Sequence, residues 1–241
     1  MFDLIKARIR HGYQAIPDPL KVGIDPAFPG LPKLELNADL ELLQALCPTD
    51  AFSEKGLDLG KCIFCGLCHR SHPDMISFSN NYKMAADTRE KLILAPGQVG
   101  LPAMDFVLPR RFHRSFALRS VCAAGCNACE MELSAANNVN FDISRYGIDF
   151  VASPRHADAL ILTGPISANM ASALSETWIA IPEPKFLILC GACAISGGIF
   201  AKSDAIDRAF LKHWTACLFL PGCPTHPLSI ISGITGIMGR S

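Results

Sequence analysis

The sequence lacks an excess of charge of either sign. It contains 22 basic and 22 acidic residues, so its formal net charge is zero. Proteins that bind nucleic acids normally carry a basic excess on one face. We therefore expect no nucleic-acid partner for this chain.

Long hydrophobic runs are also absent. Half of the 241 residues are apolar, yet no stretch approaches the roughly 18 apolar residues of a membrane-spanning helix. The opening residues, MFDLIKARIRHG, lack the apolar core of a secretory signal. We therefore expect a cytoplasmic protein, in a compartment where disulfides are disfavoured.

Cysteine, by contrast, is abundant. The chain has 11 cysteines, an odd number, and most of them lie in short motifs. In a reducing compartment, clustered cysteines are more typical of metal ligands or redox groups than of disulfides.

Composition divides the chain into three parts. Residues 1–94 hold short apolar segments between Pro, Gly and Asn, and residues 95–117, with three prolines and two glycines, are typical of a linker. In residues 118–241, near-continuous apolar runs alternate with segments of helical length and composition. The runs lie at 148–152, 159–162, 186–189 and 217–220, and the helical segments at 166–180 and 203–214. This alternation predicts an α/β fold with a parallel sheet covered on both faces.

The first part contains one dense cysteine motif. Cys62, Cys65 and Cys68 form a C-x2-C-x2-C run. Cys47 lies upstream, directly before Pro48. In two-cluster ferredoxins, an iron–sulfur cluster takes three thiolates from such a run and the fourth from a distant Cys-Pro pair. These cysteines therefore predict one four-iron, four-sulfur (4Fe-4S) cluster.

The same part lacks the ligands of a second cluster. A complete ferredoxin run reads C-x2-C-x2-C-x3-C-P. The positions missing around Cys47 and Cys68 would all have bound the same cluster. They are occupied by Asn37, Leu40, Leu43 and His72. We interpret residues 1–94 as a ferredoxin-like domain reduced from two clusters to one, with His72 as an ordinary polar residue.

A structural zinc site of four cysteines is the alternative for the first set. Zinc sites usually pair one C-x2-C motif with another. This chain instead has a triple run and a distant Cys-Pro, which favours iron–sulfur.

The third part contains a second, more dispersed set of cysteines. A C-x2-C pair follows the apolar segment 116–121, and single cysteines follow the segments 186–190 and 217–220. The set consists of Cys126, Cys129, Cys193 and Cys223. Ligands of a doubly wound sheet gather outside the carboxyl ends of its strands, so we expect these thiolates to converge on a second 4Fe-4S cluster. Neighbouring glycines allow the backbone to approach it closely.

Three cysteines fall outside both sets. Cys190 and Cys217 lie in or at the end of apolar runs, where a free cysteine behaves as a small buried hydrophobe. Cys122 lies only four residues before Cys126, but Cys126 and Cys129 already supply a compact pair. We interpret all three as non-ligands.

The ordered motifs of the third part resemble a known family. C-N-A-C-E-M-E, S-P-R-H-A-D, L-T-G, G-A-C-x3-G-G and P-G-C-P-x-x-P resemble the small subunit of membrane-bound, formate hydrogenlyase-type nickel–iron hydrogenases. That family is homologous to a cluster-bearing subunit of respiratory complex I. The motifs M-F-x-x-I-K and L-G-K-C-I-F-C-G-L-C resemble the separate ferredoxin-like subunit of the same complexes.

The resemblance implies a fold and roles for individual residues. It implies a flavodoxin-like doubly wound parallel sheet in 118–241 and a small α+β ferredoxin-like domain in 1–94. It makes the second cysteine set the ligands of the cluster nearest the catalytic centre and leaves Cys122 out. Arg155 and His156 then face a large subunit or stabilise a turn. Glu130 and Glu132 are either carboxylates at a helix start or partner-facing acids.

The implied function is that of an oxidoreductase subunit without catalytic residues of its own. It is the electron-transfer small subunit of a membrane-associated nickel–iron hydrogenase-like complex, relaying electrons through two 4Fe-4S clusters. The expected partners are a hydrogenase-like large subunit, membrane subunits and an electron donor or acceptor protein. The expected location is peripheral, on the inner face of the cell membrane, through partner subunits. The C-x2-C pair favours the hydrogenase branch, because complex I-type subunits carry two adjacent cysteines there.

Two other functions stay open. One is a subunit of a complex I-like ferredoxin- or quinone-linked ion-pumping oxidoreductase without hydrogenase activity. The other is a non-redox scaffold that holds zinc. A basic run is either a solvated linker or a contact with anionic lipid or a membrane subunit. It consists of Arg110, Arg111, His113 and Arg114.

Overall fold

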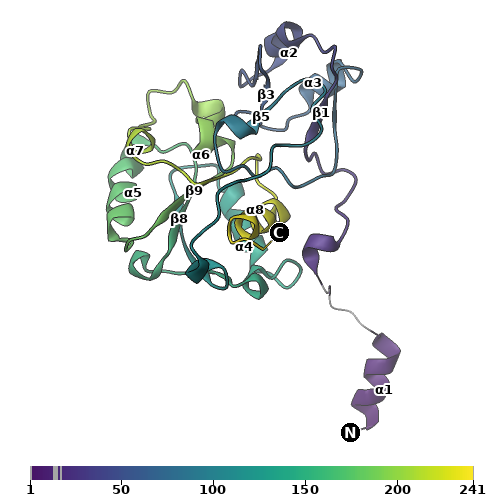
Figure 1. Ribbon diagram of the computed structural model, residues 1–241, viewed down its shortest axis with the longest axis vertical. Coiled ribbons are helices and arrows are strands. Elements are labelled where there is room, and N and C mark those ends of the chain that lie inside the picture. Colours follow the sequence, from purple (N-terminus) through teal and green to yellow (C-terminus); the bar gives the residue numbers. More distant parts are fainter. Residues whose placement is uncertain (1, 13–15, 17, 241) are drawn as a thin grey trace.

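The computed structural model describes residues 2–12, 16 and 18–240. Figure 1 shows a large α/β lobe, a small lobe above it, and a helix that stands apart from both. The separate helix is α1 (Phe2–His11), which has no buried residue. Among the helices of the described residues, none combines the length and apolar character that crossing a bilayer requires.

The small lobe contains two small antiparallel sheets and two short helices. Strand β1 (Pro32–Leu34) pairs with β4 (Ile76–Phe78). The second sheet has the order β2-β3-β5. Its strands are β2 (Phe52–Ser53), β3 (Gly56–Asp58) and β5 (Ile93–Leu94), and the helices are α2 (Leu40–Leu46) and α3 (Leu67–Ser71). This mixed content matches the predicted small α+β architecture.

Local sequence explains the bounds of α2. The Asp39 carboxylate accepts a hydrogen bond from the Leu42 N–H at 3.0 Å and so caps the first turn. The helix ends at Leu46, because Cys47 precedes Pro48 and the residue before a proline is disfavoured in the helical region. Cys47 therefore lies where the chain leaves the helix.

The large lobe is built on a five-stranded parallel sheet with the order β10-β9-β8-β6-β7. Numbered along the chain within this sheet, the order is the 2-1-3-4-5 of flavodoxin-like folds. The strands are β6 (Phe116–Cys122), β7 (Ile148–Phe150), β8 (Ala159–Thr163), β9 (Phe186–Cys190) and β10 (Leu218–Leu220). The predicted fold class and the four predicted runs are confirmed.

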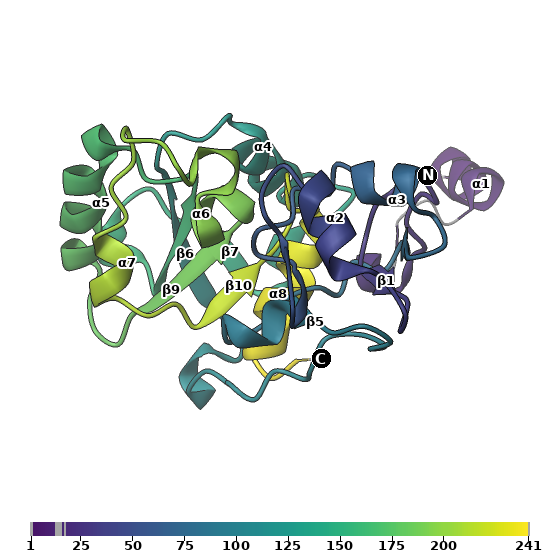
Figure 2. The same cartoon turned by 90° about the horizontal axis from the view of Figure 1, so that it is seen from above.

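Both faces of the sheet are covered by helices, as Figures 1 and 2 show. Leu160 and Leu162 of β8 share an apolar cluster with Trp178 of α5 (Ala168–Ala180). Ile161, between them in sequence, shares a second cluster with Leu133. That second face is covered by α4 (Ala128–Ala136) and α8 (Pro227–Ile237). Burial on both faces explains why the strands read as continuous apolar runs.

One predicted helix is wrong. Within 203–214 only α7 (Phe210–His213) is helical. The preceding residues form turns because their backbone pairs with the start of α5: the Ala168 N–H donates to the Ala205 carbonyl at 2.9 Å, and the Asp207 N–H donates to the Ile166 carbonyl at 2.8 Å. Pairing with a distant segment outweighs local helical composition here.

Short helices complete the connections. The helix α6 (Ala192–Ser196) follows β9 directly. The described 3-10 turns are η1 (Pro19–Lys21), η2 (Glu90–Leu92), η3 (Arg110–Phe112), η4 (Ile143–Tyr146), η5 (Pro154–His156) and η6 (Gly198–Phe200).

The two lobes are joined by a backbone bridge and a shared core. Ala86 and Phe219 exchange hydrogen bonds, with N···O distances of 3.1 and 2.7 Å. One apolar cluster contains both Leu34 of the small lobe and Leu160 of the large one. The division into residues 1–94, 95–117 and 118–241 stays a prediction.

Candidate iron–sulfur centres

The four cysteines of the first set line a single hollow. Cys47 enters from the end of α2, and the other three come from the loop before α3 and from its first turn. Apolar side chains, including Phe52, Leu57 and Phe78, line the rest. The structure therefore brings together all four residues of this predicted ligand set: Cys47, Cys62, Cys65 and Cys68.

In the loop before α3, two residues adopt backbone angles in the left-handed region. Phe64 has a φ of 52° and Gly66 a φ of 70°. The turn aims a backbone donor at sulfur: the Phe64 N–H donates to Cys62 Sγ at 3.3 Å. The Ala51 N–H donates likewise to Cys47 Sγ at 3.4 Å. Hydrogen bonds to ligand sulfurs are one means by which proteins set cluster potentials.

The electrostatics of the first set suit a cationic group. Burial raises the pKa of the Cys62 thiol, and the other three thiols of the set raise it further. Burial also raises the pKa of the Cys68 thiol, again with contributions from its neighbours. Four thiolates so close together need positive charge among them, which a metal core supplies. The donor set and the hollow therefore fit a four-iron cluster.

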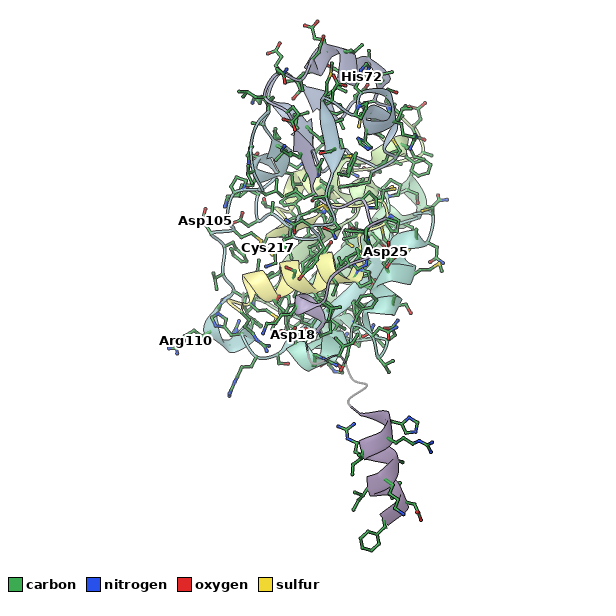
Figure 3. All side chains as sticks on the ribbon, turned by 90° about the vertical axis from the view of Figure 1, so that its right-hand side faces the viewer. Asp18, Asp25, His72, Asp105, Arg110 and Cys217 are labelled. Carbon is green, nitrogen blue, oxygen red and sulfur yellow. The ribbon has the colours of Figure 1, made fainter. Side chains whose placement is uncertain are left out.

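The four positions that a second ferredoxin cluster would need do not line this hollow. Leu43 is completely buried and Leu40 packs on the same core, so apolar side chains occupy their place. Asn37 is exposed. His72 lies at the far end of the small lobe (Figure 3), where its backbone N–H donates to the Cys68 carbonyl at 2.8 Å. The structure does not add His72 to the lining of the first site.

The second cysteine set lies at the carboxyl edge of the large sheet. Cys126 and Cys129 follow β6, Cys193 follows β9, and Cys223 follows β10. Burial raises the pKa of Cys193 to about 11, with further contributions from Cys223, Cys129 and Cys126. The four thiols are therefore within electrostatic reach of one another. They gather near the switch in strand order between β6 and β8, where such folds bind ligands.

Two glycines allow the backbone to approach these sulfurs. Gly191 has a φ of +89°, and a Cβ placed on it would lie 2.6 Å from Cys129 Sγ. A Cβ on Gly198 would lie 3.0 Å from Cys193 Sγ. Any larger residue at 191 would push into the sulfur. The cradle and the thiol set fit a second cluster.

The cysteines outside the two sets have different surroundings. Cys190 is completely buried in the core, but its thiol also contacts Cys129: a hydrogen bond between them raises the pKa of the Cys129 thiol. Burial raises the pKa of Cys217 to about 12. Cys122 is exposed and hydrogen-bonds to Glu130. The contact between Cys190 and Cys129 could not be predicted from the sequence, because it joins β9 to α4, which are distant along the chain.

The two glutamates beside the second set differ. Glu130 lies in the first turn of α4, and its Oε1 accepts a hydrogen bond from Thr163 Oγ1 at 2.5 Å. Burial opposes ionisation of Glu130, but hydrogen bonds from Cys122 and Thr163 outweigh it and lower the pKa. Glu132 lacks such donors, and burial raises its pKa. Glu130 is thus held as a carboxylate beside the cluster ligands.

One pocket is lined by residues from both cysteine loops. Phe64, from the first cysteine loop, and Cys223, from the second set, both line it. Cys65 is one of the thiols that raise the pKa of Cys223, although burial contributes most. The two cysteine sets therefore lie close enough to interact electrostatically. Sequence reasoning missed Phe64 and His226 as pocket residues, because their proximity arises only in the folded chain.

Two further observations describe the surroundings. Arg155 and His156 are exposed on η5. Within residues 2–12, 16 and 18–240, no group of three or more His, Cys, Asp or Glu side chains is gathered tightly enough for a single metal ion.

Comparison with known proteins places the large lobe in a family. Residues 126–237 match the family described as NADH ubiquinone oxidoreductase, 20 Kd subunit. An uncharacterized protein of Methanocaldococcus jannaschii is 39% identical over 128 residues, which cover 53% of this chain and 86% of that protein. The chain belongs to this family. The 20 kDa-subunit family supplies oxidoreductase subunits.

Other members of the 20 kDa-subunit family come from hydrogenases. Formate hydrogenlyase subunit 7 of Escherichia coli is 36% identical over 139 residues, covering 58% of this chain and 54% of the relative. The chain thus spans about half the length of that relative. A probable membrane-bound hydrogenase subunit of Pyrococcus furiosus is 34% identical over 114 residues, covering 47% of this chain and 68% of the relative.

Proposed function

We propose that this chain is the electron-transfer small subunit of a membrane-associated nickel–iron hydrogenase-like complex. The observation that carries the proposal is the presence of two four-thiol sets in one chain, with Phe64 of the first cysteine loop and Cys223 of the second set lining the same pocket. Membership of the 20 kDa-subunit family and similarity to hydrogenase subunits support the type of complex.

Each thiol set would hold one 4Fe-4S cluster. Bound there, the clusters would supply one-electron redox chemistry. The protein contributes the ligands, the backbone donors to sulfur and the apolar surroundings. The first set comprises Cys47, Cys62, Cys65 and Cys68, and the second Cys126, Cys129, Cys193 and Cys223.

The small lobe would act as a built-in ferredoxin-like domain. Cys65 and Cys223 would lie on the facing sides of the two sites, because Phe64, next to Cys65, lines the same pocket as Cys223. Electrons would enter or leave through the small lobe and cross between these two ligands. An external donor or acceptor protein would dock near Cys65, which is exposed.

The large lobe would present the second site to a catalytic large subunit. Cys126 and Cys223 are exposed. Apolar side chains nearby also face solvent, with Met131 66% and Ile199 62% exposed. Exposed apolar groups beside ligands are typical of a surface that a partner covers. Through that partner and membrane subunits, the chain would lie at the inner face of the cell membrane.

Hydrogen-driven reduction of the native complex tests the proposal. The complex is isolated through an affinity tag on this chain and exposed to hydrogen, and the clusters are followed by low-temperature electron paramagnetic resonance (EPR). We expect hydrogen alone to reduce both clusters. If hydrogen leaves them oxidised while reduced ferredoxin reduces them, the complex is the ion-pumping, complex I-like alternative. Bound zinc in place of iron would contradict both.

A further inference from the structure

Helix α1 has no buried residue along its whole length. In Figure 1 it projects from the lower end of the molecule, and Figure 2 shows it outside both lobes. Phe2, Ile5 and Ile9 are 79%, 52% and 76% exposed. Their spacing places them on one face of the helix. An apolar stripe of this kind needs a partner.

The charges of α1 indicate the nature of that partner. Lys6, Arg8 and Arg10 are basic, and Asp3 is the one acidic residue in the helix. At 100° per residue, Lys6 and Arg8 lie on opposite sides of the apolar stripe. Because the whole chain is neutral, the remaining residues are net acidic. The helix therefore carries net positive charge, whereas the rest of the chain is net negative.

We propose that α1 is an interfacial anchor that binds an anionic lipid bilayer. A short basic helix with an apolar stripe lies in the plane of a membrane, with its cations at the headgroups. On the body, Asp18 Oδ1 accepts a hydrogen bond from the Tyr146 hydroxyl at 2.8 Å. Figure 3 shows Asp18 at the end of the body from which the chain leads to α1. The anchor contacts lipid directly, in addition to any contact through partner subunits.

Vesicle flotation of the cluster-loaded chain tests the anchor. Vesicles of phosphatidylglycerol and phosphatidylcholine are compared with vesicles of phosphatidylcholine alone. We expect binding to the anionic vesicles, at least tenfold weaker in the double variant Ile5→Glu/Ile9→Glu. Lys6→Gln/Arg10→Gln should weaken binding and reduce its sensitivity to salt. The control is Val139→Glu, at an 89% exposed position on the large lobe.

Two outcomes would overturn the anchor. One is the absence of binding to anionic vesicles by the unaltered chain. The other is equal binding by Ile5→Glu/Ile9→Glu and the control. Iron content and circular dichroism confirm that each variant remains folded. Since α1 contacts neither cysteine set, its failure would leave the proposed electron-transfer function unaffected.

A second inference concerns Arg208 and rests on the proposed second cluster. Its guanidinium donates to four carbonyls, those of Pro165, Cys193, Ala194 and Ile195, at 3.2, 3.1, 2.7 and 3.0 Å. Three of them belong to α6, and of these the Cys193 carbonyl also accepts a hydrogen bond from the Gly197 N–H at 2.9 Å. Arg208 thus fastens the segment that carries a cluster ligand.

The same contacts fix a positive charge beside Cys193. The ion pairs of the described residues include no carboxylate for Arg208, so its charge is not cancelled locally. A nearby positive charge stabilises the more negative, reduced state of a cluster. We infer that Arg208 is a positioning residue that also raises the reduction potential of the second cluster.

Redox titration of the second cluster, followed by EPR, tests this role. Arg208→Gln should lower the midpoint potential, whereas Arg208→Lys should keep it close to that of the unaltered chain. Arg111→Gln is the control, because Arg111 precedes β6 and so lies at the opposite end of the sheet from Cys193. A purely structural role predicts equal potentials in the Gln and Lys variants, and that result would overturn the inference. Absence of the second cluster from the unaltered chain would instead reject the proposed function.

Discussion

At the scale of single residues, sulfur positions depend on backbone that only certain residues adopt. Gly191 shows this most directly, because it combines a φ of +89° with the approach to Cys129 Sγ. Phe64, between Cys62 and Cys65, also adopts a left-handed backbone, with a φ of 52°. Because Phe64 is not a glycine, this conformation costs conformational free energy. These backbone conformations position the cysteine side chains of both sets.

Replacement of Gly191 should remove the second cluster selectively. In Gly191→Ala, the new methyl group lies 2.6 Å from Cys129 Sγ, which no packed pair of atoms tolerates. We expect the iron content to fall to about half, with the first cluster retained. Iron analysis and EPR measure this. Gly23→Ala, where nothing lies within 4 Å, is the matched control and should keep all its iron.

At the scale of elements, α2 packs into the core of the small lobe through one of its leucines. Leu43 is completely buried, whereas Leu42 on the same helix is 39% exposed. We expect Leu43→Ala to lower the free energy of unfolding by about 2–5 kcal/mol, as for other large-to-small core changes. Urea unfolding measures the difference. Leu42→Ala is the control, and equal losses in both variants would contradict the packing role of Leu43.

The sequence correctly predicts those strands and helices whose pattern of apolar residues is set by burial. The strands of the large sheet were found because both of their faces are buried, and α5 because its composition and its contacts agree. The helix predicted at 203–214 is wrong because Ala205 and Asp207 form backbone hydrogen bonds with residues 166–168. Local composition does not encode contacts with a distant segment.

The cysteine sets could be grouped from the sequence because motif spacing and strand ends constrain them. What the sequence could not give is the mutual placement of the two sites. That depends on the bridge between Ala86 and Phe219, which brings the lobes together across more than a hundred residues. Phe64 and His226 line one pocket with Cys223 for the same reason.

At the scale of the whole molecule, residues 95–117 are tied to the body by a buried carboxylate. Asp87 Oδ2 accepts hydrogen bonds from the N–H groups of Asp105 and Phe106 at 2.6 and 2.9 Å. Lys91 Nζ lies 2.8 Å from Asp87 Oδ1. Burial acts to raise the pKa of Asp87, but these hydrogen bonds outweigh it and lower the pKa. The segment is therefore held in place by a charged group.

Loss of that charge should destabilise the protein. We expect Asp87→Asn to cost about 1.5–3 kcal/mol of unfolding free energy at neutral pH, since hydrogen bonds to charged groups are worth that much. The folded pKa lies below the ordinary 3.8, so the contribution is present above pH 3.8 and lost as pH falls through the folded value. Urea unfolding across this range measures it, with the exposed Asp74→Asn as control. A difference that does not shrink in acid would contradict the assignment.

The central claim concerns the whole chain: two four-thiol sites, each holding a four-iron cluster. Iron and acid-labile sulfide analysis of the anaerobically purified protein, with EPR of its reduced form, tests it most directly. We expect about eight irons and eight sulfides per chain, and two interacting EPR signals after full reduction. We also expect Cys62→Ser and Cys193→Ser to remove different clusters. About four irons per chain, or zinc in either site, would contradict the central claim.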